Sequence, residues 1–262
     1  MLCYPDRRSA LRAGAAVAAG ALTAACGASG RTDPAPTAPT SAAAPSPAGA
    51  PAVAPAPHRF PGQPVEIGHG PRDRPRVALT FHGNGDPATA RAILAEAEKG
   101  GARVTVLAIG SWLDAHPEMA RRILDGGHEL GNHTQRHLAV NAMPEAEAYA
   151  EITQCAQRLK RLTGSIGSWF RPSQTRYATP LVRTLAQRAG YPHVLSYDVD
   201  SLDFTSPGAA AVIRTVTGTI RSGSVVSLHF GYADTVAAMP PLLEELARRK
   251  LRAVTTTELL TP

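Results

Sequence analysis

The feature that most constrains the fold is a regular alternation of short apolar runs and longer helical segments, from about residue 76 to the end of the chain. Runs rich in strand-forming residues, such as RVALTF at 76–81, alternate with segments whose apolar positions follow a helical period. Strands that alternate with helices predict a parallel sheet covered by those helices. The expected strands cover 76–81, 103–110, 128–133, 168–172, 193–200, 224–230 and 252–260.

Signals at the ends of the intervening segments agree with this alternation. Asp86 can cap the helix that Pro87 opens, because aspartate accepts hydrogen bonds from free backbone N–H groups and proline suits the first helical position. About seven strand–helix units favour a barrel over an open sheet. The expected helices cover 88–101, 117–127, 144–162, a segment ending at 190, 208–221 and 236–250.

Several function classes find no support in the sequence. No GxGxxG or Walker loop follows the first strand, so the nucleotide-binding fingerprints are missing. The net charge is +6, but the basic residues are scattered over amphipathic helices, and nucleic acid is not an expected partner. The three cysteines, Cys3, Cys26 and Cys155, have neither CxxC nor zinc-ribbon spacing, so no disulfide framework is expected.

The first 25 residues have the pattern of an export signal. A basic start with Arg7 and Arg8 precedes a short stretch of small apolar residues, which is too short for a transmembrane span. The RRSAL run resembles a twin-arginine signal, and LTAAC resembles a lipoprotein cleavage box that would leave Cys26 lipidated. A plain secretory signal is the alternative.

Residues 26–62 are rich in Ala, Pro, Ser and Thr and are expected to form a disordered tether. A spacer behind an anchor would hold the remaining domain, 63–262, away from the membrane and near the wall. We therefore expect an exported monomer that is either lipid-anchored or secreted, and that meets the membrane only through its N-terminal lipid.

Polar residues that could carry chemistry follow the ends of five expected strands. The carboxyl ends of barrel strands meet at one face, where active sites lie. In GNHTQRH, two histidines four residues apart would share one side of a helical turn, a spacing that suits two imidazole ligands of a metal ion. The residues at these strand ends are His82, His133, His137, Arg171, Asp200, Asp203 and His229.

The motifs GHELGNHTQRH, WFRP, DVDSLDF and VVSLHF occur in the order that the polysaccharide deacetylases show. The segment from about 75 to 260 resembles this NodB-homology family, carbohydrate esterase family 4. The resemblance implies a distorted (β/α) barrel of about seven strands and a catalytic divalent metal. It also implies hydrolysis of N-acetyl groups on amino-sugar polymers, or of O-acetyl groups on sugars.

The resemblance assigns roles to individual residues on the metal side of the site. His133 and His137 correspond to two metal ligands. Arg171 corresponds to the arginine that orients the catalytic base, and Pro172 follows it in the family's Arg-Pro motif.

Further assignments concern the leaving group and the substrate. Asp203 corresponds to the carboxylate that holds and tunes the acid histidine, although Phe204 replaces the usual tryptophan after it. His229 corresponds to the general acid, and Leu228 to part of a pocket for the acetyl methyl group. Phe230 replaces the usual aspartate after the acid histidine.

The chain departs from the family at the motif TFDDG, whose first Asp is the base and whose second Asp is a metal ligand. Here His82 and Gly83 occupy these two positions. One interpretation makes His82 the third ligand of a three-histidine site for Zn²⁺, Ni²⁺ or Co²⁺, with Asp200 as base. A second makes His82 the base, since its reference pKa of about 6.5 suits that role, with Asp86 or water as third ligand. In a third, the site is inactive and the domain only binds glycan.

Together these features predict an exported, wall-associated, metal-dependent hydrolase that removes N-acetyl groups from an amino-sugar polymer such as peptidoglycan. A degenerate glycan-binding domain and a small-molecule amide hydrolase of the same fold are the alternatives.

Overall fold

The computed structural model describes residues 54–262, so the expected export signal, Cys26 and most of the expected tether lie outside the described residues. Residues 54–62 were assigned to the tether by composition, but they pack against the domain. Ala54 and Phe60 are buried, and the Phe60 ring stacks on Trp169 with centroids 5.6 Å apart. The Pro55 carbonyl accepts a hydrogen bond from Ser165 Oγ. The folded part therefore begins earlier than residue 63.

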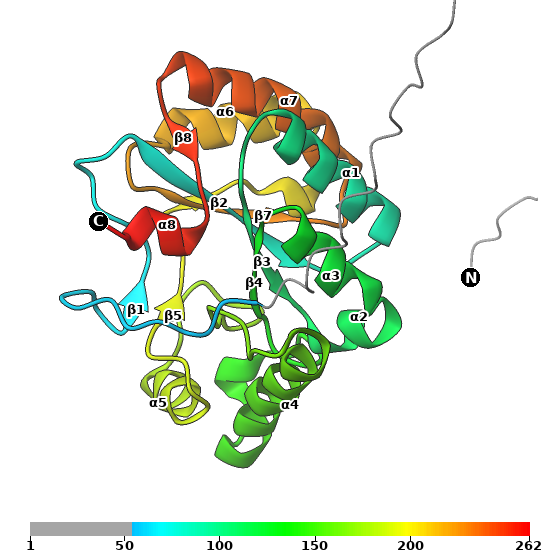
Figure 1. Ribbon diagram of the computed structural model, residues 1–262, viewed down its shortest axis with the longest axis vertical. Coiled ribbons are helices and arrows are strands. Elements are labelled where there is room, and N and C mark those ends of the chain that lie inside the picture. The colour runs from blue at the N-terminus through cyan, green and yellow to red at the C-terminus, as the bar shows by residue number, and fades with distance from the viewer. Residues whose placement is uncertain (1–53) are drawn as a thin grey trace, which may run out of the picture. The chain divides into compact units, whose positions relative to one another are not determined.

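The central sheet is parallel and has its longest strand, β2, in the middle (Figure 1). Every pairing between its strands is parallel, as the alternation of strands and helices predicts. The order is β4-β3-β2-β7-β6, and β8 pairs with the start of β2. The bounds are β2 (Arg76–Gly83), β3 (Thr105–Ala108), β4 (Glu129–Asn132), β6 (Val199–Asp200), β7 (Val225–His229) and β8 (Arg252–Ala253).

Beyond β4, isolated bridges and two-residue strands replace the longer strand pairings of the central sheet. Phe170 makes single parallel bridges to Asn132 and to Val194, where a full strand over 168–172 was expected. Val194 belongs to β5 (Val194–Leu195), which pairs with β1 (Glu66–Ile67). The expected strand at 193–200 is in fact two strands, β5 and β6. The distorted barrel class is confirmed, although the described residues form eight short strands.

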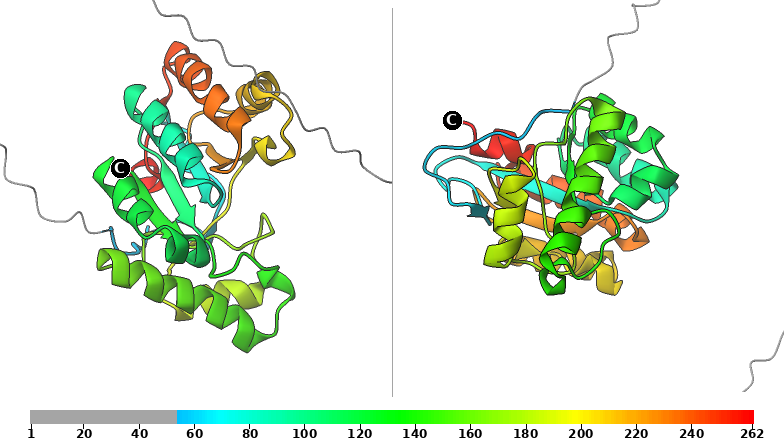
Figure 2. Two further views of the ribbon diagram at one scale, coloured as in Figure 1. Left: turned by 90° about the vertical axis from the view of Figure 1, so that its right-hand side faces the viewer. Right: turned by 90° about the horizontal axis from the view of Figure 1, so that it is seen from below.

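The helices surround the strands (Figure 1). α7 packs on α1 and α6, and α4 lies beside α5, as the view from below shows (Figure 2). Asp86 accepts a hydrogen bond from Ala88 N at 2.9 Å and Pro87 is the first residue of α1, as predicted. The bounds are α1 (Pro87–Lys99), α2 (Gly110–Ala115), α3 (Glu118–Asp125), α4 (Glu145–Thr163), α5 (Pro180–Arg188), α6 (Ala209–Thr219) and α7 (Ala233–Arg248).

The chain ends in a short helix where a strand over 252–260 was expected. β8 is followed by α8 (Thr256–Leu260), which begins with a capping box. Thr255 Oγ1 accepts from Glu258 N, and the Glu258 carboxylate accepts from Thr255 N at 3.0 Å. A Thr-x-x-Glu sequence is a recognised signal for this motif.

Two packed layers fix the strand ends. One apolar cluster lies between the sheet and the helices and includes Phe81, Ile93 and Leu242. A second cluster, which includes Leu107 and Trp169, brings together residues of several strands with the chain termini of the domain. No helix within residues 54–262 is both long enough and apolar enough to cross a membrane.

Candidate active site

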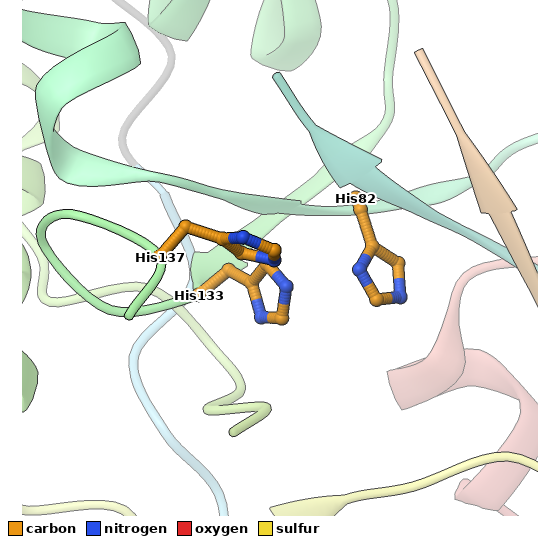
Figure 3. A group of neighbouring side chains, drawn as sticks. All are labelled: His82, His133 and His137. Atoms are coloured by element: carbon orange, nitrogen blue, oxygen red, sulfur yellow. The ribbon is translucent and has the colours of Figure 1, made fainter. Parts of the chain in front are cut away.

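Three histidines from two strand ends converge on one point (Figure 3). His82 lies in β2, while His133 and His137 belong to the loop after β4. One ring nitrogen from each lies within 4.8 Å of the others. The rings of His82 and His133 are 4.4 Å apart, and those of His133 and His137 are 4.9 Å apart. We call these three residues the metal half of the site.

The loop that carries two of these histidines is not the helical turn that their spacing suggested. Thr134 and His137 have φ angles of 67° and 59°, a left-handed conformation that is uncommon outside glycine and costs roughly 1–3 kcal/mol. Hydrogen bonds hold it: Thr134 N donates to Asn132 Oδ1 at 2.8 Å, and Arg136 N donates to the buried Glu151 carboxylate at 2.8 Å. The loop therefore presents both rings in a fixed position.

His133 is set up to offer a lone pair. Its Nδ1 lies 3.0 Å from the carbonyl oxygen of Arg171, which can only accept, so Nδ1 carries the proton and donates. Its Nε2 is buried and has no hydrogen-bond partner among the described residues. An unsatisfied buried nitrogen costs about 1–3 kcal/mol, and a metal ion would satisfy it.

Burial also keeps the three imidazoles in the form that binds metal. Loss of solvation lowers the pKa of His82 and of His133 well below the usual value, and lowers that of His137. Repulsion from neighbouring histidines acts in the same direction. Neutral imidazole is the ligand form, so these side chains fit a divalent ion that accepts three nitrogens.

His82 contacts two residues through its outer nitrogen. Its Nε2 lies 3.1 Å from Ser227 Oγ and 3.4 Å from Arg171 Nη1, whereas Nδ1 faces His133 and His137 (Figure 3). If Nε2 donates to Ser227, then Nδ1 is free to bind metal. Arg171 can only donate, and an Nε2 that accepted from it would leave the proton on Nδ1. Ser227 therefore helps to decide which nitrogen of His82 carries the proton. The sequence did not point to Ser227 as a functional residue.

Arg171 is fully buried behind His82. Its Nε and Nη2 donate to the carbonyl oxygens of Leu195 and Ser196, both at 3.1 Å. Burial lowers the pKa of the guanidinium to about 10, so it remains charged at neutral pH. The arginine thus faces the residue at the family's base position, as the Arg-Pro motif led us to expect, but that residue is a histidine.

Gly83 leaves no room for the missing carboxylate. A Cβ at this position would lie 2.9 Å from Ala108 Cα and 2.9 Å from Val106 Cγ1. Asp86 does not replace it, because its carboxylate caps α1 and does not belong to the metal half. The interpretation in which Asp86 supplies the third ligand is therefore wrong.

The opposite side of the site, which we call the acid half, consists of Asp203 and His229. The Asp203 carboxylate is buried and accepts from His229 N at 2.8 Å, from His229 Nδ1 at 2.6 Å and from Thr235 Oγ1 at 2.7 Å. This fixes the ring and leaves Nε2 to face the cavity. The rings of His82 and His229 are 4.3 Å apart, so the two halves adjoin.

A cavity of about 690 Å³ opens over both halves, and His82, His137 and His229 line it. Asp200 also lines it, but its carboxylate accepts from Leu202 N at 3.1 Å and lies 3.4 Å from the Tyr197 hydroxyl. Leu228 and Pro172, expected at the substrate, are buried and do not line this cavity. Leu228 lies in the core cluster with Phe81 instead, since successive residues of β7 point to opposite faces.

Comparison with known proteins identifies the family and agrees with this fold. The family described as polysaccharide deacetylase matches residues 69–194. A peptidoglycan-N-acetylglucosamine deacetylase of Bacillus cereus is 31% identical over 194 residues, which cover 72% of this chain and 90% of the relative. Among solved structures, a carbohydrate esterase family 4 pseudoenzyme from Bacillus anthracis has a TM-score of 0.72 at 22% identity, over 76% of this chain and 70% of that one. A mutant of that protein with restored enzymatic activity also has a TM-score of 0.72 at 22% identity, over 76% of this chain and 72% of that one.

The fold is that of a class of α/β hydrolases, and the site contains three histidines that could hold a metal ion. The chain belongs to the polysaccharide deacetylase family, whose members hydrolyse carbon–nitrogen bonds other than peptide bonds. The solved structures add support for the fold.

Proposed function

We propose that this protein is an exported, metal-dependent deacetylase that hydrolyses N-acetyl groups of an amino-sugar polymer of the cell wall, with peptidoglycan as its substrate. One observation carries the proposal. His133 Nε2 is a buried lone pair without a partner in the described part of the chain, and it points to the place where His82 and His137 also converge. The relative from Bacillus cereus, which is named for deacetylation of peptidoglycan, supports the substrate.

His82, His133 and His137 would hold the ion, with Zn²⁺ as the first choice and Ni²⁺ or Co²⁺ as alternatives. A divalent ion at such a site supplies a Lewis acid that polarises an acetyl carbonyl and lowers the pKa of water. Because His82 then serves as a ligand, the carboxylate of Asp200 is the remaining candidate for the base. It would have to reach the reacting water from its present hydrogen bonds to Tyr197 and Leu202.

The acid half would complete the reaction. Asp203 holds Nδ1 of His229, so that Nε2 can carry a proton towards the cavity and donate it to the leaving sugar nitrogen. The expected export and lipid anchor at Cys26 would place this chemistry at the wall.

A second function is favoured by a specific observation, the loss of the carboxylate at Gly83. If His82 keeps its proton on Nδ1 because Nε2 accepts from Arg171, only two nitrogens remain for the metal, and the domain would bind glycan without hydrolysing it. The tautomer of His82 thus separates the two functions.

The test measures metal content and acetate release on the protein purified without a histidine tag. We expect one equivalent of Zn²⁺ per chain, and release of acetate from peptidoglycan that stops when a chelator is added. The control is a His133→Ala, His137→Ala double variant, which should have neither property. A metal-free protein that releases no acetate, whatever divalent ion is supplied, would sink the deacetylase and leave the binding module.

A further inference from the structure

A positively charged side chain, that of Arg176, also lines the cavity over the metal half, and the proposed reaction does not explain its role. Arg176 lines the cavity together with His82 and His137. It is half-buried, and no carboxylate within residues 54–262 lies in ion-pair distance of it. Asp200 lines the same cavity but is held by other groups. A positive charge therefore faces the place where a substrate would lie.

The guanidinium of Arg176 is held in one orientation. Its Nε donates to the carbonyl oxygen of Tyr197 at 3.0 Å. Its Cζ lies 5.1 Å from the ring centre of Tyr177 and 5.1 Å from that of Tyr197, within the range of cation–π contacts. The two terminal nitrogens make no hydrogen bond to any described residue. The guanidinium of Arg176 is thus held through Nε, while Nη1 and Nη2 remain available as donors. This arrangement suits a carboxylate that accepts two parallel hydrogen bonds.

The segment that carries Arg176 is tied to the metal half. Gln174 Nε2 donates to the carbonyl oxygen of His137 at 2.7 Å, two residues before Arg176. Ser196 Oγ donates to the carbonyl oxygen of Arg176 itself at 2.8 Å. The distance between the cation and the histidines is therefore set by the fold, so that an anion bound at Arg176 would hold a substrate in register with the reacting centre.

We propose that the site selects an amino-sugar polymer that carries a free carboxylate close to the acetamido group, such as the lactyl ether of a peptide-free N-acetylmuramic acid unit, and that Arg176 is the specificity-determining residue. This inference rests on the proposed deacetylase function and narrows its substrate.

The experiment measures dissociation constants in the presence of Zn²⁺ for glycan strands of peptidoglycan freed of their peptides, with the lactyl carboxylates either free or converted to methyl esters. We expect the free acid to bind about tenfold more tightly than the ester, as a charge-assisted bidentate contact allows. In Arg176→Gln the two glycans should bind equally. Arg176→Lys, which keeps the charge without the two parallel donors, should retain part of the preference.

Arg214→Gln is the matched control, because Arg214 is exposed on α6 and does not line the cavity. It should bind both glycans as the parent protein does. Equal binding of acid and ester by the parent protein would overturn the inference, and so would an unchanged preference in Arg176→Gln with an unchanged thermal midpoint.

Acetate release is measured on the same two glycans, so that the two proposals fail separately. Acetate release without any preference for the free acid would overturn the role of Arg176 alone. A preference in binding without acetate release from either glycan would overturn the deacetylase and leave Arg176 as the selective residue of a glycan-binding site.

Discussion

The acid half and the metal half face each other across one cavity, but their hydrogen bonds differ. The Asp203 carboxylate accepts three hydrogen bonds from the protein, and His229 Nδ1 donates one of them. In the metal half, His133 Nε2 has no partner in the described chain. Burial of the metal half therefore costs free energy that only an added ligand can recover. The protein's own hydrogen bonds satisfy the acid half, whereas the metal half keeps one buried nitrogen without a partner among residues 54–262.

The largest expected effect follows from removing the orphaned nitrogen. His133→Ala should weaken Zn²⁺ binding by about 10³-fold, since each ligand accounts for a few kcal/mol of a zinc site, and acetate release should fall to background. Competition with a chromophoric chelator measures the affinity. His69→Ala, at an exposed residue away from the cavity, is the control. Unchanged zinc affinity in His133→Ala would show that the metal half is not a metal site.

A change in the acid half should lower turnover and leave zinc affinity nearly unchanged. Asp203→Asn should reduce kcat by about 10² to 10⁴-fold, the usual contribution of acid–base catalysis, because His229 loses the carboxylate that accepts from its Nδ1 and so leaves the proton-bearing Nε2 towards the cavity. Zinc affinity should stay within about twofold of the parent value. Measuring turnover and zinc content on the same preparation checks both. Zinc loss as large as that of His133→Ala would mean that the two halves are one unit.

Ser227→Ala examines the tautomer of His82. Without the Ser227 acceptor, His82 Nε2 has only Arg171 beside it, which favours a proton on Nδ1 and removes one metal ligand. Groups that orient a ligand are typically worth about 10 to 100-fold in metal affinity. Ser227→Thr keeps the hydroxyl and should recover most of the loss. Equal affinity of the Ala variant and the parent would indicate that Ser227 does not orient His82.

A further prediction concerns the stability of the metal-free protein in acid. Burial lowers the pKa of the three histidines in the folded state, whereas they titrate near 6.5 when unfolded. As the pH falls below about 6.5 the unfolded chain takes up protons that the folded chain refuses, so stability is present above this pH and is lost below it. The metal-free protein should lose up to about 1.4 kcal/mol per pH unit for each histidine. Thermal midpoints from pH 7 to 5 measure this, and His133→Ala should flatten the slope.

The cap at Asp86 and the alternation around β2 could be predicted, because capping and period signals are local. Parallel strands also predicted that polar residues after their carboxyl ends would share one face, and His82, His133 and His137 do come together there. The conformation of the loop after β4 could not be predicted, because it depends in part on the contact of Arg136 N with Glu151 of α4, a residue distant in the sequence. Ser227 lies within the motif VVSLHF, but its contact with His82 could not be predicted because it depends on how β7 pairs with β2.

Three other features differ from the prediction although the sequence contains a signal for each of them. The Thr-x-x-Glu capping box at Thr255 identifies α8, but the β-branched run before it favoured a strand. Phe60 lies in a Pro-rich segment, yet an aromatic residue in such a segment can anchor it to the domain. Leu228 was carried over with its motif, whereas the alternation along β7 already assigned it to the core side.

Gly83 has a consequence for how the site could be altered by protein engineering. An aspartate there would force β2 away from β3, because even its Cβ would overlap Ala108 and Val106, and overpacking of this kind costs about 1–3 kcal/mol. Returning to two adjacent carboxylates is therefore not one substitution away, even with Asp in place of His82. A library that connects the two ligand sets therefore has to vary His82 and Gly83 together with Val106 and Ala108.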